Sequence, residues 1–299
     1  MAAAPPLLLL APSRFTLPRP FLKWVGGKGQ LLGRLLSAMA EAGNFRTYHE
    51  PFVGGGALFF ELHRQGALRN GAVLSDRNPH LIEVWQAVRS DVDGLIERLS
   101  EHRERHDEGY YYCVRAEIPE DSTGRAARVI YLNKTCFNGL YRENSRGRFN
   151  VPVGRYTDPP ILDEDNLRAC SLALANVELR CQGFEEAANA VGRHDFVYFD
   201  PPSVPVSKTS VFTSYQKGGF GEADQRRLAQ VYTDLTQRDT RAMLSNSWAE
   251  LVLDCYGAFT IHELSASRNL NSRTDRRGAV SEALIDNFQQ LPSARKIAV

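Results

Sequence analysis

The sequence lacks the features of a membrane protein, of a secreted disulfide scaffold and of a zinc protein. Its five cysteines are odd in number and form no Cys-x-x-Cys pair, which argues against disulfides or zinc and fits a reducing cytoplasm. The apolar run 7–10 falls far short of the roughly 18–20 apolar residues of a membrane helix. No basic segment precedes this run, as a secretory signal requires. We therefore expect a cytoplasmic protein with no membrane partner.

The chain also lacks a large net charge, because its 36 basic and 35 acidic residues sum to only +1. The distribution along the chain is uneven. Seven basic residues stand against a single acid, Glu143, between 125 and 155, and four stand against Asp275 between 268 and 277. Between 91 and 108, in contrast, seven acids outnumber three bases. A local basic segment is what phosphate binding requires, so the neutral total does not exclude a nucleic-acid partner.

Hydrophobic periodicity predicts a mixed α/β protein. Hydrophobic residues make up 43% and charged residues 24% of the chain, as in globular proteins. Residues 1–20, rich in Ala, Pro and Leu, are expected to form a mostly disordered tail. Strands are expected at 48–56 (ending in a glycine turn), 72–76, 196–199 and 241–244, and helices at 31–39, 57–65 and 222–238. Residues 79–132 have a helical pattern and 133–160 that of a structured loop or hairpin, which predicts a mostly parallel sheet interrupted by a helical insert.

Two local motifs carry chemistry. Gly54, Gly55 and Gly56 follow a strand and precede a helix, and Asp76 ends a strand about 20 residues later, which is the arrangement of a nucleotide-cofactor site. The turn is not Gly-x-Gly-x-x-Gly, so a cofactor with adenosine but no phosphates fits better. The second motif, Asp200-Pro201-Pro202, follows an apolar strand. A carboxylate and a proline carbonyl held in a rigid frame can accept both hydrogens of an exocyclic amino group.

Together these motifs resemble the DNA adenine methyltransferases of the Dam and DpnII-methylase type, which use S-adenosylmethionine. The resemblance covers about residues 21–290. The matching stretches, in the order of the family, are FLKWVGGKGQLL (21–32), YHEPFVGGGALFFEL (48–62), LSDRN (74–78), LNKTCFNGLYRENSRGRFNVPVGRY (132–156), DFVYFDPP (195–202), FTSYQKGGFGEADQRRLA (212–229), LSNS (244–247) and RRGAVSEALIDN (276–287).

The resemblance implies a role for each matching position. The implied cofactor-binding residues are Trp24, Lys28, Glu50, Phe52, Gly54, Gly56, Asp76, Phe184 and Asp200. The implied catalytic loop is Asp200, Pro201, Pro202 and Ser203. The implied DNA-binding residues are Lys23, Phe137, Leu140, Arg142, Asn144, Arg146, Pro152 and Arg276, with Tyr156 in the same hairpin. An arginine can pair with guanine, proline can pack on a thymine methyl, and an apolar wedge can unstack bases.

The fold implied is a Rossmann-like class I methyltransferase sheet with an inserted helical DNA-recognition domain. The catalytic domain would comprise 21–78 and 158–299, and the recognition domain 79–157. The implied partner is double-stranded DNA with GATC as the target, bound by a monomer or weak dimer associated with the nucleoid. A cognate restriction endonuclease is a further possible partner, and no metal is expected. His102 and His106 are four residues apart but lie on a helix of mixed charge.

Two positions depart from the family pattern. The family's catalytic loop ends in an aromatic residue that stacks on the flipped adenine, and here that position is Ser203. Phe212 or Tyr215 is a candidate for supplying the missing ring. Many relatives also carry an acid just before the position of Phe184, where this chain has Gly183 preceded by Gln182, whose amide is a candidate substitute. Two alternatives therefore stay open: a methyltransferase-derived DNA-binding protein with weak or lost catalysis, and, from the glycine turn alone, a nicotinamide-dependent oxidoreductase.

Overall fold

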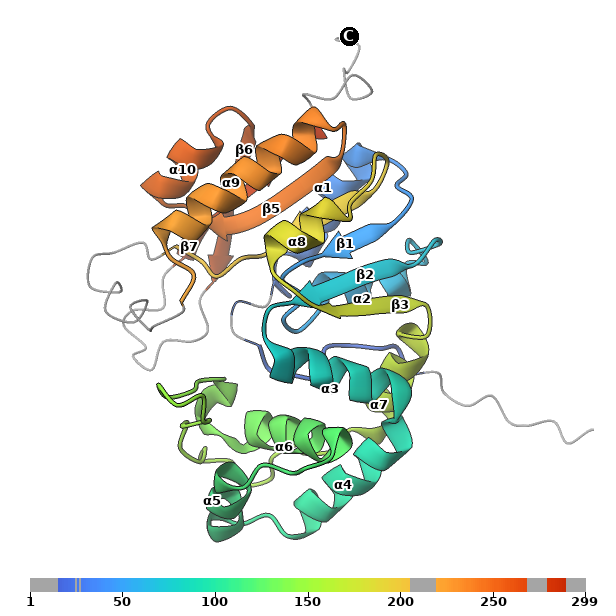
Figure 1. Cartoon of the computed structure of the whole chain (residues 1–299), viewed down its shortest axis with the longest axis vertical. Helices are drawn as coiled ribbons and strands as arrows, with labels where there is room; N and C mark the ends of the chain where they lie inside the picture. The colour runs from blue at the N-terminus through green and yellow to red at the C-terminus, as the bar shows by residue number, and fades with distance from the viewer. Residues whose placement is uncertain (1–15, 25, 27, 205–218, 268–278, 289–299) are drawn as a thin grey trace, which may run out of the picture.

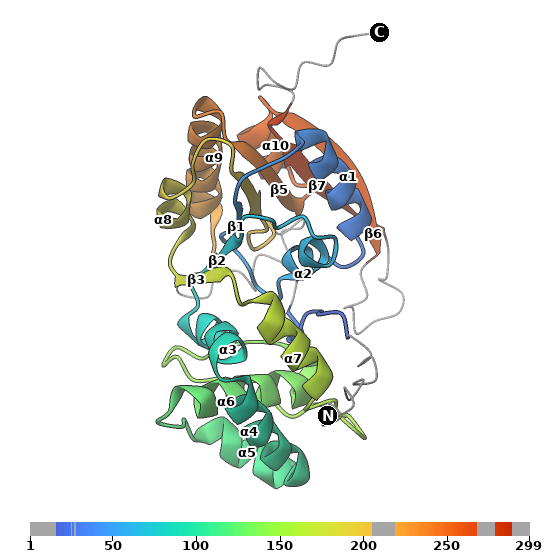
Figure 2. The same ribbon diagram turned by 90° about the vertical axis from the view of Figure 1, so that its right-hand side faces the viewer.

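The computed structural model describes residues 16–24, 26, 28–204, 219–267 and 279–288, and its centre is a seven-stranded sheet (Figures 1 and 2). The strand order is β3-β2-β1-β4-β5-β7-β6. The strands are β1 (Tyr48–Glu50), β2 (Ala72–Asp76), β3 (Val177–Cys181), β4 (Phe196–Phe199), β5 (Arg241–Ser247), β6 (Thr260–Ser267) and β7 (Ala279–Asp286). The first five run parallel, and β7 pairs antiparallel with both β5 and β6. The predicted α/β class with a mostly parallel sheet is confirmed.

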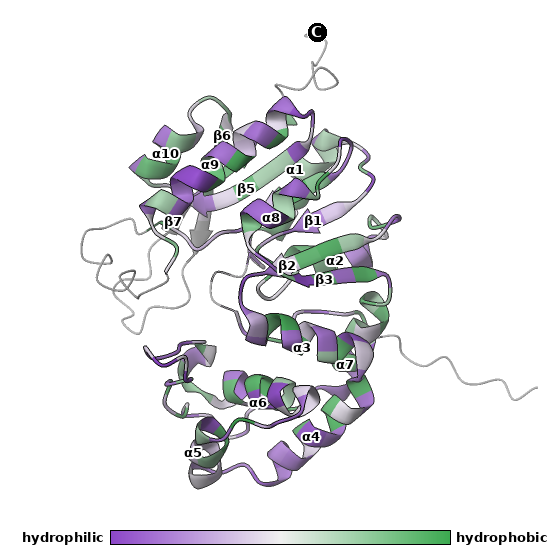
Figure 3. Cartoon of the chain, viewed as in Figure 1, coloured by the Kyte–Doolittle hydropathy of each residue, from purple (hydrophilic) through white to green (hydrophobic). Residues whose placement is uncertain are grey.

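Helices cover both faces of this sheet. Figure 2 shows α1 (Leu32–Ala42) and α2 (Ala57–Arg64) on one side and α8 (Phe184–Asn189) and α9 (Glu222–Gln237) on the other. The helix α10 (Glu250–Tyr256) packs beside α9. Because both faces are covered, β4 is buried at every position. Figure 3 shows β2 hydrophobic along most of its length, whereas α9 carries both hydrophilic and hydrophobic residues, as an amphipathic surface helix does.

A helical region lies beyond the β3 edge of the sheet (Figure 1). It contains α3 (Pro79–Ser90), α4 (Val92–Glu104), α5 (Glu108–Ala116), α6 (Ser122–Thr135) and α7 (Glu164–Ala173), with a short 3-10 helix (Phe137–Gly139) after α6. Between α6 and α7 the chain forms an irregular hairpin, bridged at Cys136–Val153 and Glu143–Phe149. The starts of four of these helices are fixed by side chains that accept backbone hydrogen bonds in the first turn, namely Asn78, Asp107, Asp121 and Asp163.

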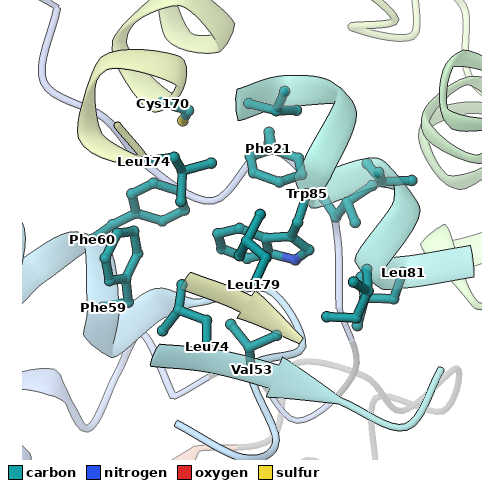
Figure 4. Close-up of a cluster of buried hydrophobic side chains, with 14 of the residues drawn as sticks. Phe21, Val53, Phe59, Phe60, Leu74, Leu81, Trp85, Cys170, Leu174 and Leu179 are labelled. Atoms are coloured by element: carbon teal, nitrogen blue, oxygen red, sulfur yellow. The ribbon is translucent and has the colours of Figure 1, made fainter. Parts of the chain in front are cut away.

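One hydrophobic core joins the helical region to the sheet. Trp85 of α3 is fully buried, and its ring lies 4.9 Å from that of Phe21 and 5.6 Å from that of Phe60 in α2. Figure 4 shows these side chains together with Leu74 of β2 and Leu179 of β3. The core therefore continues across residue 79, where the helical region begins.

The segment before α1 is attached to this region. The backbone N–H of Arg19 donates to Asn166 Oδ1 (3.0 Å), and the Asn166 amide donates back to the Arg19 carbonyl (3.1 Å). The Arg19 guanidinium also pairs with Asp163. Arg19 belongs to the segment 1–20 that composition predicts to be mostly disordered, and it is instead held by a buried asparagine of α7. Residues 1–15 lie outside the described residues.

A buried carboxylate fixes the ends of β1 and β4 opposite to the glycine turn. Asp195 accepts hydrogen bonds from the backbone N–H groups of Thr47 (3.2 Å) and Gly192 (2.8 Å) and from Arg46 Nε (3.2 Å), and it lies 3.3 Å from His49 Nε2. Burial raises the pKa of this carboxyl, but the hydrogen bonds and the nearby positive charges outweigh burial and leave the pKa lowered.

We expect Asp195→Asn to lower the free energy of unfolding by about 2–4 kcal/mol at pH 7, because its amide would face the Gly192 N–H with a second donor. A lowered carboxyl pKa contributes stability that is present above the ordinary value near 4 and is lost as the pH falls through the folded value. Urea unfolding should show the difference from wild type shrinking below about pH 4. The exposed Asp158→Asn is the control, and an equal loss there would contradict this role.

Candidate active site

The predicted motifs meet at one edge of the sheet. Glu50, Asp76 and Asp200 lie at the carboxyl ends of β1, β2 and β4. Strand β1 lies between the other two in the sheet. The chain therefore leaves β1 toward β2 on one side and later continues at β4 on the other. Open α/β sheets bind their ligands at such a change of direction, outside the carboxyl ends of the strands.

The glycine turn has a shape that two tryptophans enforce. Gly54 has φ +47° and Gly56 has φ +66°, both in the left-handed region. A Cβ on Gly54 would lie 2.6 Å from Trp24 Cδ1, and a Cβ on Gly56 would lie 2.4 Å from Trp85 Cη2. The Trp85 indole N–H also donates to the Gly54 carbonyl (3.2 Å). The glycines are thus required by backbone conformation and by close packing.

Asp200 is held by two donors on a single oxygen. Lys28 Nζ lies 2.8 Å from Asp200 Oδ1, and the Ser245 hydroxyl donates to the same oxygen at 2.9 Å. Tyr198 completes this chain of contacts with its hydroxyl 2.8 Å from Ser245 Oγ. Among the described residues, no hydrogen bond reaches the second oxygen, Oδ2.

The electrostatics of this group follow from burial and from pairing. Burial by itself lowers the pKa of the Lys28 ammonium, but the Asp200 and Glu282 carboxylates outweigh it and leave the pKa raised. Burial raises the pKa of the Asp200 carboxyl, and Lys28 and Ser245 offset only part of that effect. Lys28 therefore stays charged at neutral pH and favours the ionised form of Asp200.

Glu50 lies in the same buried edge and differs from Asp200 in its charge. Burial raises the pKa of Glu50 to about 8, although the Tyr48 hydroxyl, which donates to Glu50 at 2.8 Å, opposes the change. Glu50 is therefore largely protonated near pH 7, because no cation pairs with it among the described residues.

Two side-chain amides hold the backbone of the predicted catalytic loop. Gln225 Nε2 donates to the Pro202 carbonyl (2.9 Å), and the Val204 N–H donates to Asn246 Oδ1 (3.1 Å). Asn246 and Gln225 are themselves joined at 3.1 Å. No hydrogen bond to the Pro201 carbonyl comes from the described part of the chain. Ser203 is exposed. Phe212 and Tyr215 lie outside the described residues.

An aromatic cluster lies beside the glycine turn. The rings of Phe52 and Phe184 are stacked at 5.7 Å, and Phe220 meets them edge-on at 5.5 and 5.7 Å. The nearby Gln182 has a buried amide nitrogen without a hydrogen-bond partner among the described residues. These groups fit an adenosine. The apolar rings can pack on the base, the unpaired amide can donate a hydrogen bond, and the Asp76 carboxylate can accept hydrogen bonds from the ribose hydroxyls.

The hairpin after α6 carries the residues predicted to bind DNA. The Phe137 ring is 44% exposed, and the Phe137 N–H is tied to the Pro152 carbonyl at 2.9 Å. Arg142 is exposed and donates to Asn150 Oδ1 (2.7 Å). Lys23 Nζ lies 4.4 Å from the centre of the exposed Tyr156 ring.

The remaining predicted DNA-binding residues differ in exposure. Pro152 and Arg146 are exposed, and Leu140 is half-buried. Asn144 accepts the backbone N–H groups of Arg146 (2.9 Å) and Arg148 (3.1 Å), so its side chain shapes the turn. Arg276 lies outside the described residues.

Two contacts connect this hairpin to the glycine turn. The buried Asn133 bonds both backbone groups of Lys23 (2.8 Å each) and donates to the Gly139 carbonyl (3.1 Å). Trp24, which packs on Gly54, also lies 5.6 Å from Tyr141 of the hairpin. The predicted DNA-binding and cofactor-binding residues thus share the short segment 23–24.

The structure also brings in residues that the sequence analysis did not single out. Ser245 and Asn246 belong to the stretch LSNS, and Gln225, Phe220 and Glu282 belong to other matching stretches, but no local spacing connects them to Asp200. Within the described residues there is no group of side chains fit to hold a metal. His102 and His106 instead lie 2.8 Å from the hydroxyls of Tyr110 and Tyr131. No helix in the described ranges is long and apolar enough to span a membrane.

Comparison with known proteins identifies what this chain is similar to. Residues 24–270 match the sequence model of the D12 class N6 adenine-specific DNA methyltransferases. The chain is 42% identical over 287 residues to the Type II methyltransferase M.MjaIII of Methanocaldococcus jannaschii, covering 90% of this chain and 99% of that protein. It is 31% identical over 270 residues to the DNA adenine methylase of Escherichia coli, covering 89% and 94%. The rRNA methyltransferase aviRa of Streptomyces viridochromogenes superposes with a TM-score of 0.37 at 13% identity, over 86% of this chain and 84% of that chain.

We expect Gly54→Ala to destabilise the protein more than Gly66→Ala. Both glycines have positive φ, so each substitution costs about 1–2 kcal/mol of backbone strain. Only at Gly54 does the added methyl collide with Trp24, which adds about 1–3 kcal/mol, whereas nothing lies within 4 Å of a Cβ on Gly66. Urea unfolding measures both losses, and equal losses would mean that Trp24 can move away freely.

Proposed function

This chain belongs to the D12 class of N6 adenine-specific DNA methyltransferases, and we propose that it methylates the exocyclic amino nitrogen of adenine within GATC. The class is an enzyme class whose substrate is DNA, and its fold and family imply S-adenosylmethionine as the methyl donor. The observation that carries the proposal is the hydrogen bonding of the two Asp200 oxygens. Oxygen Oδ1 is occupied by Lys28 and Ser245, which leaves Oδ2 to accept a hydrogen from the substrate.

The edge of the sheet offers a cofactor site of fitting chemistry. Phe184 and Phe52 would pack on the adenine ring and Asp76 would bind the ribose hydroxyls. The glycine turn, with Gly54 and Gly56 held by Trp24 and Trp85, would lie under the methionine part. Bound S-adenosylmethionine supplies an electrophilic methyl group on a sulfonium, which becomes a neutral thioether when the amino nitrogen takes the methyl and its spare proton leaves to water.

The catalytic loop would orient the target nitrogen and stabilise its charge. Asp200 Oδ2 and the Pro201 carbonyl would each accept one amino hydrogen, which directs the nitrogen lone pair toward the methyl group. Positive charge that grows on the nitrogen is then stabilised by a carboxylate already held in place. Anchoring of the loop by Gln225 and Asn246 supports this role, because fixed geometry lowers the entropic barrier.

The hairpin of the recognition region, residues 79–157, would recognise DNA together with Lys23, which lies beside it. The adenine must leave the base stack to reach Asp200, and the exposed Phe137 ring suits a wedge that fills the gap. Lys23, Leu140, Arg142 and Pro152 would read bases, whereas Arg146 would contact phosphate. Because one relative is named a Type II methyltransferase, a restriction endonuclease is a further proposed partner.

We expect wild-type protein to methylate plasmid DNA that contains GATC, and plasmid without GATC at least about 100-fold more slowly. Asp200→Asn should reduce methylation of the GATC plasmid by several orders of magnitude, because the amide lacks the charge and presents hydrogens to the amino group. The exposed Asp254→Asn serves as control. Transfer of labelled methyl groups measures all four reactions. Equal labelling of both plasmids would reject GATC, and near-normal turnover of Asp200→Asn would reject the catalytic assignment.

A second candidate function is DNA binding with weak or lost catalysis, and the exposed Ser203 favours it. Base–aromatic stacking contributes about 1–3 kcal/mol per base, and serine provides none of it. We expect Ser203→Tyr to raise the single-turnover methylation rate about tenfold and to leave cofactor affinity nearly unchanged. A slower Ser203→Tyr, together with a strongly impaired Phe212→Ala, would mean that another ring of the loop already stacks on the adenine.

A further inference from the structure

Two charged side chains from distant parts of the chain join the proposed catalytic carboxylate, Asp200, in one group. Lys28 precedes α1, Asp200 follows β4, and Glu282 lies on β7. Lys28 Nζ is 2.8 Å from Asp200 Oδ1, 3.7 Å from Glu282 Oε2 and 3.0 Å from the Gly26 carbonyl. The Lys28 side chain is 6% exposed and the two carboxylates are 19% exposed each. Glu282 Oε2 is buried and accepts no hydrogen bond within the described ranges.

Glu282 is the member of this group that lies within the sheet. Strand β7 is hydrogen bonded on both sides, with Glu282 in register with Ser247 of β5 and with Leu264 of β6. Its carboxylate is therefore a fixed charge. Lys28, in contrast, lies outside any helix or strand, so its ammonium depends on its partners for its position.

The formal charges of the group depend on Glu282. One ammonium and two carboxylates leave −1, whereas the Lys28–Asp200 pair alone sums to zero. The neighbouring Glu50 adds little negative charge to this sum, because burial raises its pKa to about 8. An ammonium bound directly to the catalytic carboxylate opposes any positive charge brought to Oδ2, and in a partly buried site that opposition is poorly screened.

We propose that Glu282 is a positioning residue that neutralises Lys28, so that Lys28 can anchor Asp200 while the site keeps a net negative charge toward a cationic ligand. This inference rests on the proposed function, because the cation concerned is the sulfonium of the methyl donor. Its consequence is selectivity: the site prefers the cationic donor over the neutral thioether that remains after transfer. Product release is thereby favoured without any change of shape.

The test measures binding of two ligands that differ in this charge, S-adenosylmethionine and S-adenosylhomocysteine. By isothermal titration, Glu282→Gln should bind S-adenosylmethionine about tenfold more weakly than wild type does and S-adenosylhomocysteine within about twofold of wild type. Glu263→Gln is the matched control, because it removes an exposed carboxylate from the neighbouring strand β6. It should change neither affinity. Equal weakening of both ligands in Glu282→Gln, or no change in either, would overturn the proposal.

Substitution of Lys28 tests whether more negative charge in this group raises the preference for S-adenosylmethionine. Lys28→Met leaves the two carboxylates, so the preference for S-adenosylmethionine over S-adenosylhomocysteine should exceed that of wild type even where methylation falls. Lys28→Met combined with Glu282→Gln returns the sum to −1 and should restore a preference close to that of wild type. A purely structural role predicts instead that the two losses add in both ligands.

Two further comparisons keep the outcome decisive. If Glu282→Gln fails to fold, Glu282→Asp, which keeps the charge, should keep the wild-type preference, and Lys28→Met still tests the sign. If wild-type protein binds neither ligand and methylates no plasmid, the proposed function itself is wrong. If it methylates GATC plasmid and Glu282→Gln keeps the wild-type preference, only the role of Glu282 is wrong.

Discussion

The ion pair between Lys28 and Asp200 connects the segment before α1 with the loop after β4, and side chains from β5 and β7 are arranged around it. Two opposite charges taken out of water are stable only when further hydrogen bonds satisfy them. Here the Ser245 hydroxyl and the Gly26 carbonyl supply hydrogen bonds, and the Glu282 carboxylate adds a second negative charge 3.7 Å from the ammonium. The position of Asp200 therefore depends on residues from several strands of the sheet.

The second organising feature is the continuity between the helical region and the sheet. Trp85 of α3 packs against Gly56 of the glycine turn, and Trp24 of the segment before α1 packs against Gly54. Asn133 holds the same segment from α6. The hairpin and the glycine turn are therefore connected through packed rings and through an asparagine that bonds both segments.

Motifs contained in one local stretch were predictable from sequence. The glycine turn, Asp76 and the Asp200 loop each follow a short apolar strand, and the structure places them together at the carboxyl edge as parallel pairing requires. Glu282 and Ser245 were not identified as site residues, because their relation to Asp200 arises from strand order and register, which no local pattern encodes. Helix α7 and the β6–β7 hairpin were likewise not expected. Arg19 was assigned to the disordered tail from the composition of that segment. Composition cannot show that one buried asparagine, Asn166, binds the Arg19 backbone.

Strand β7 is the last described strand of the sequence, yet it lies between β5 and β6 in the sheet. Synthesis on the ribosome proceeds from the N-terminus, so Lys28 and Asp200 leave the ribosome well before Glu282 does. During that interval β5 has an open edge and the ammonium lacks its second carboxylate. Contacts of such long sequence separation form slowly. The newly made chain therefore passes through a stage in which its parallel strands can pair while the charge of Lys28 is not yet balanced by Glu282.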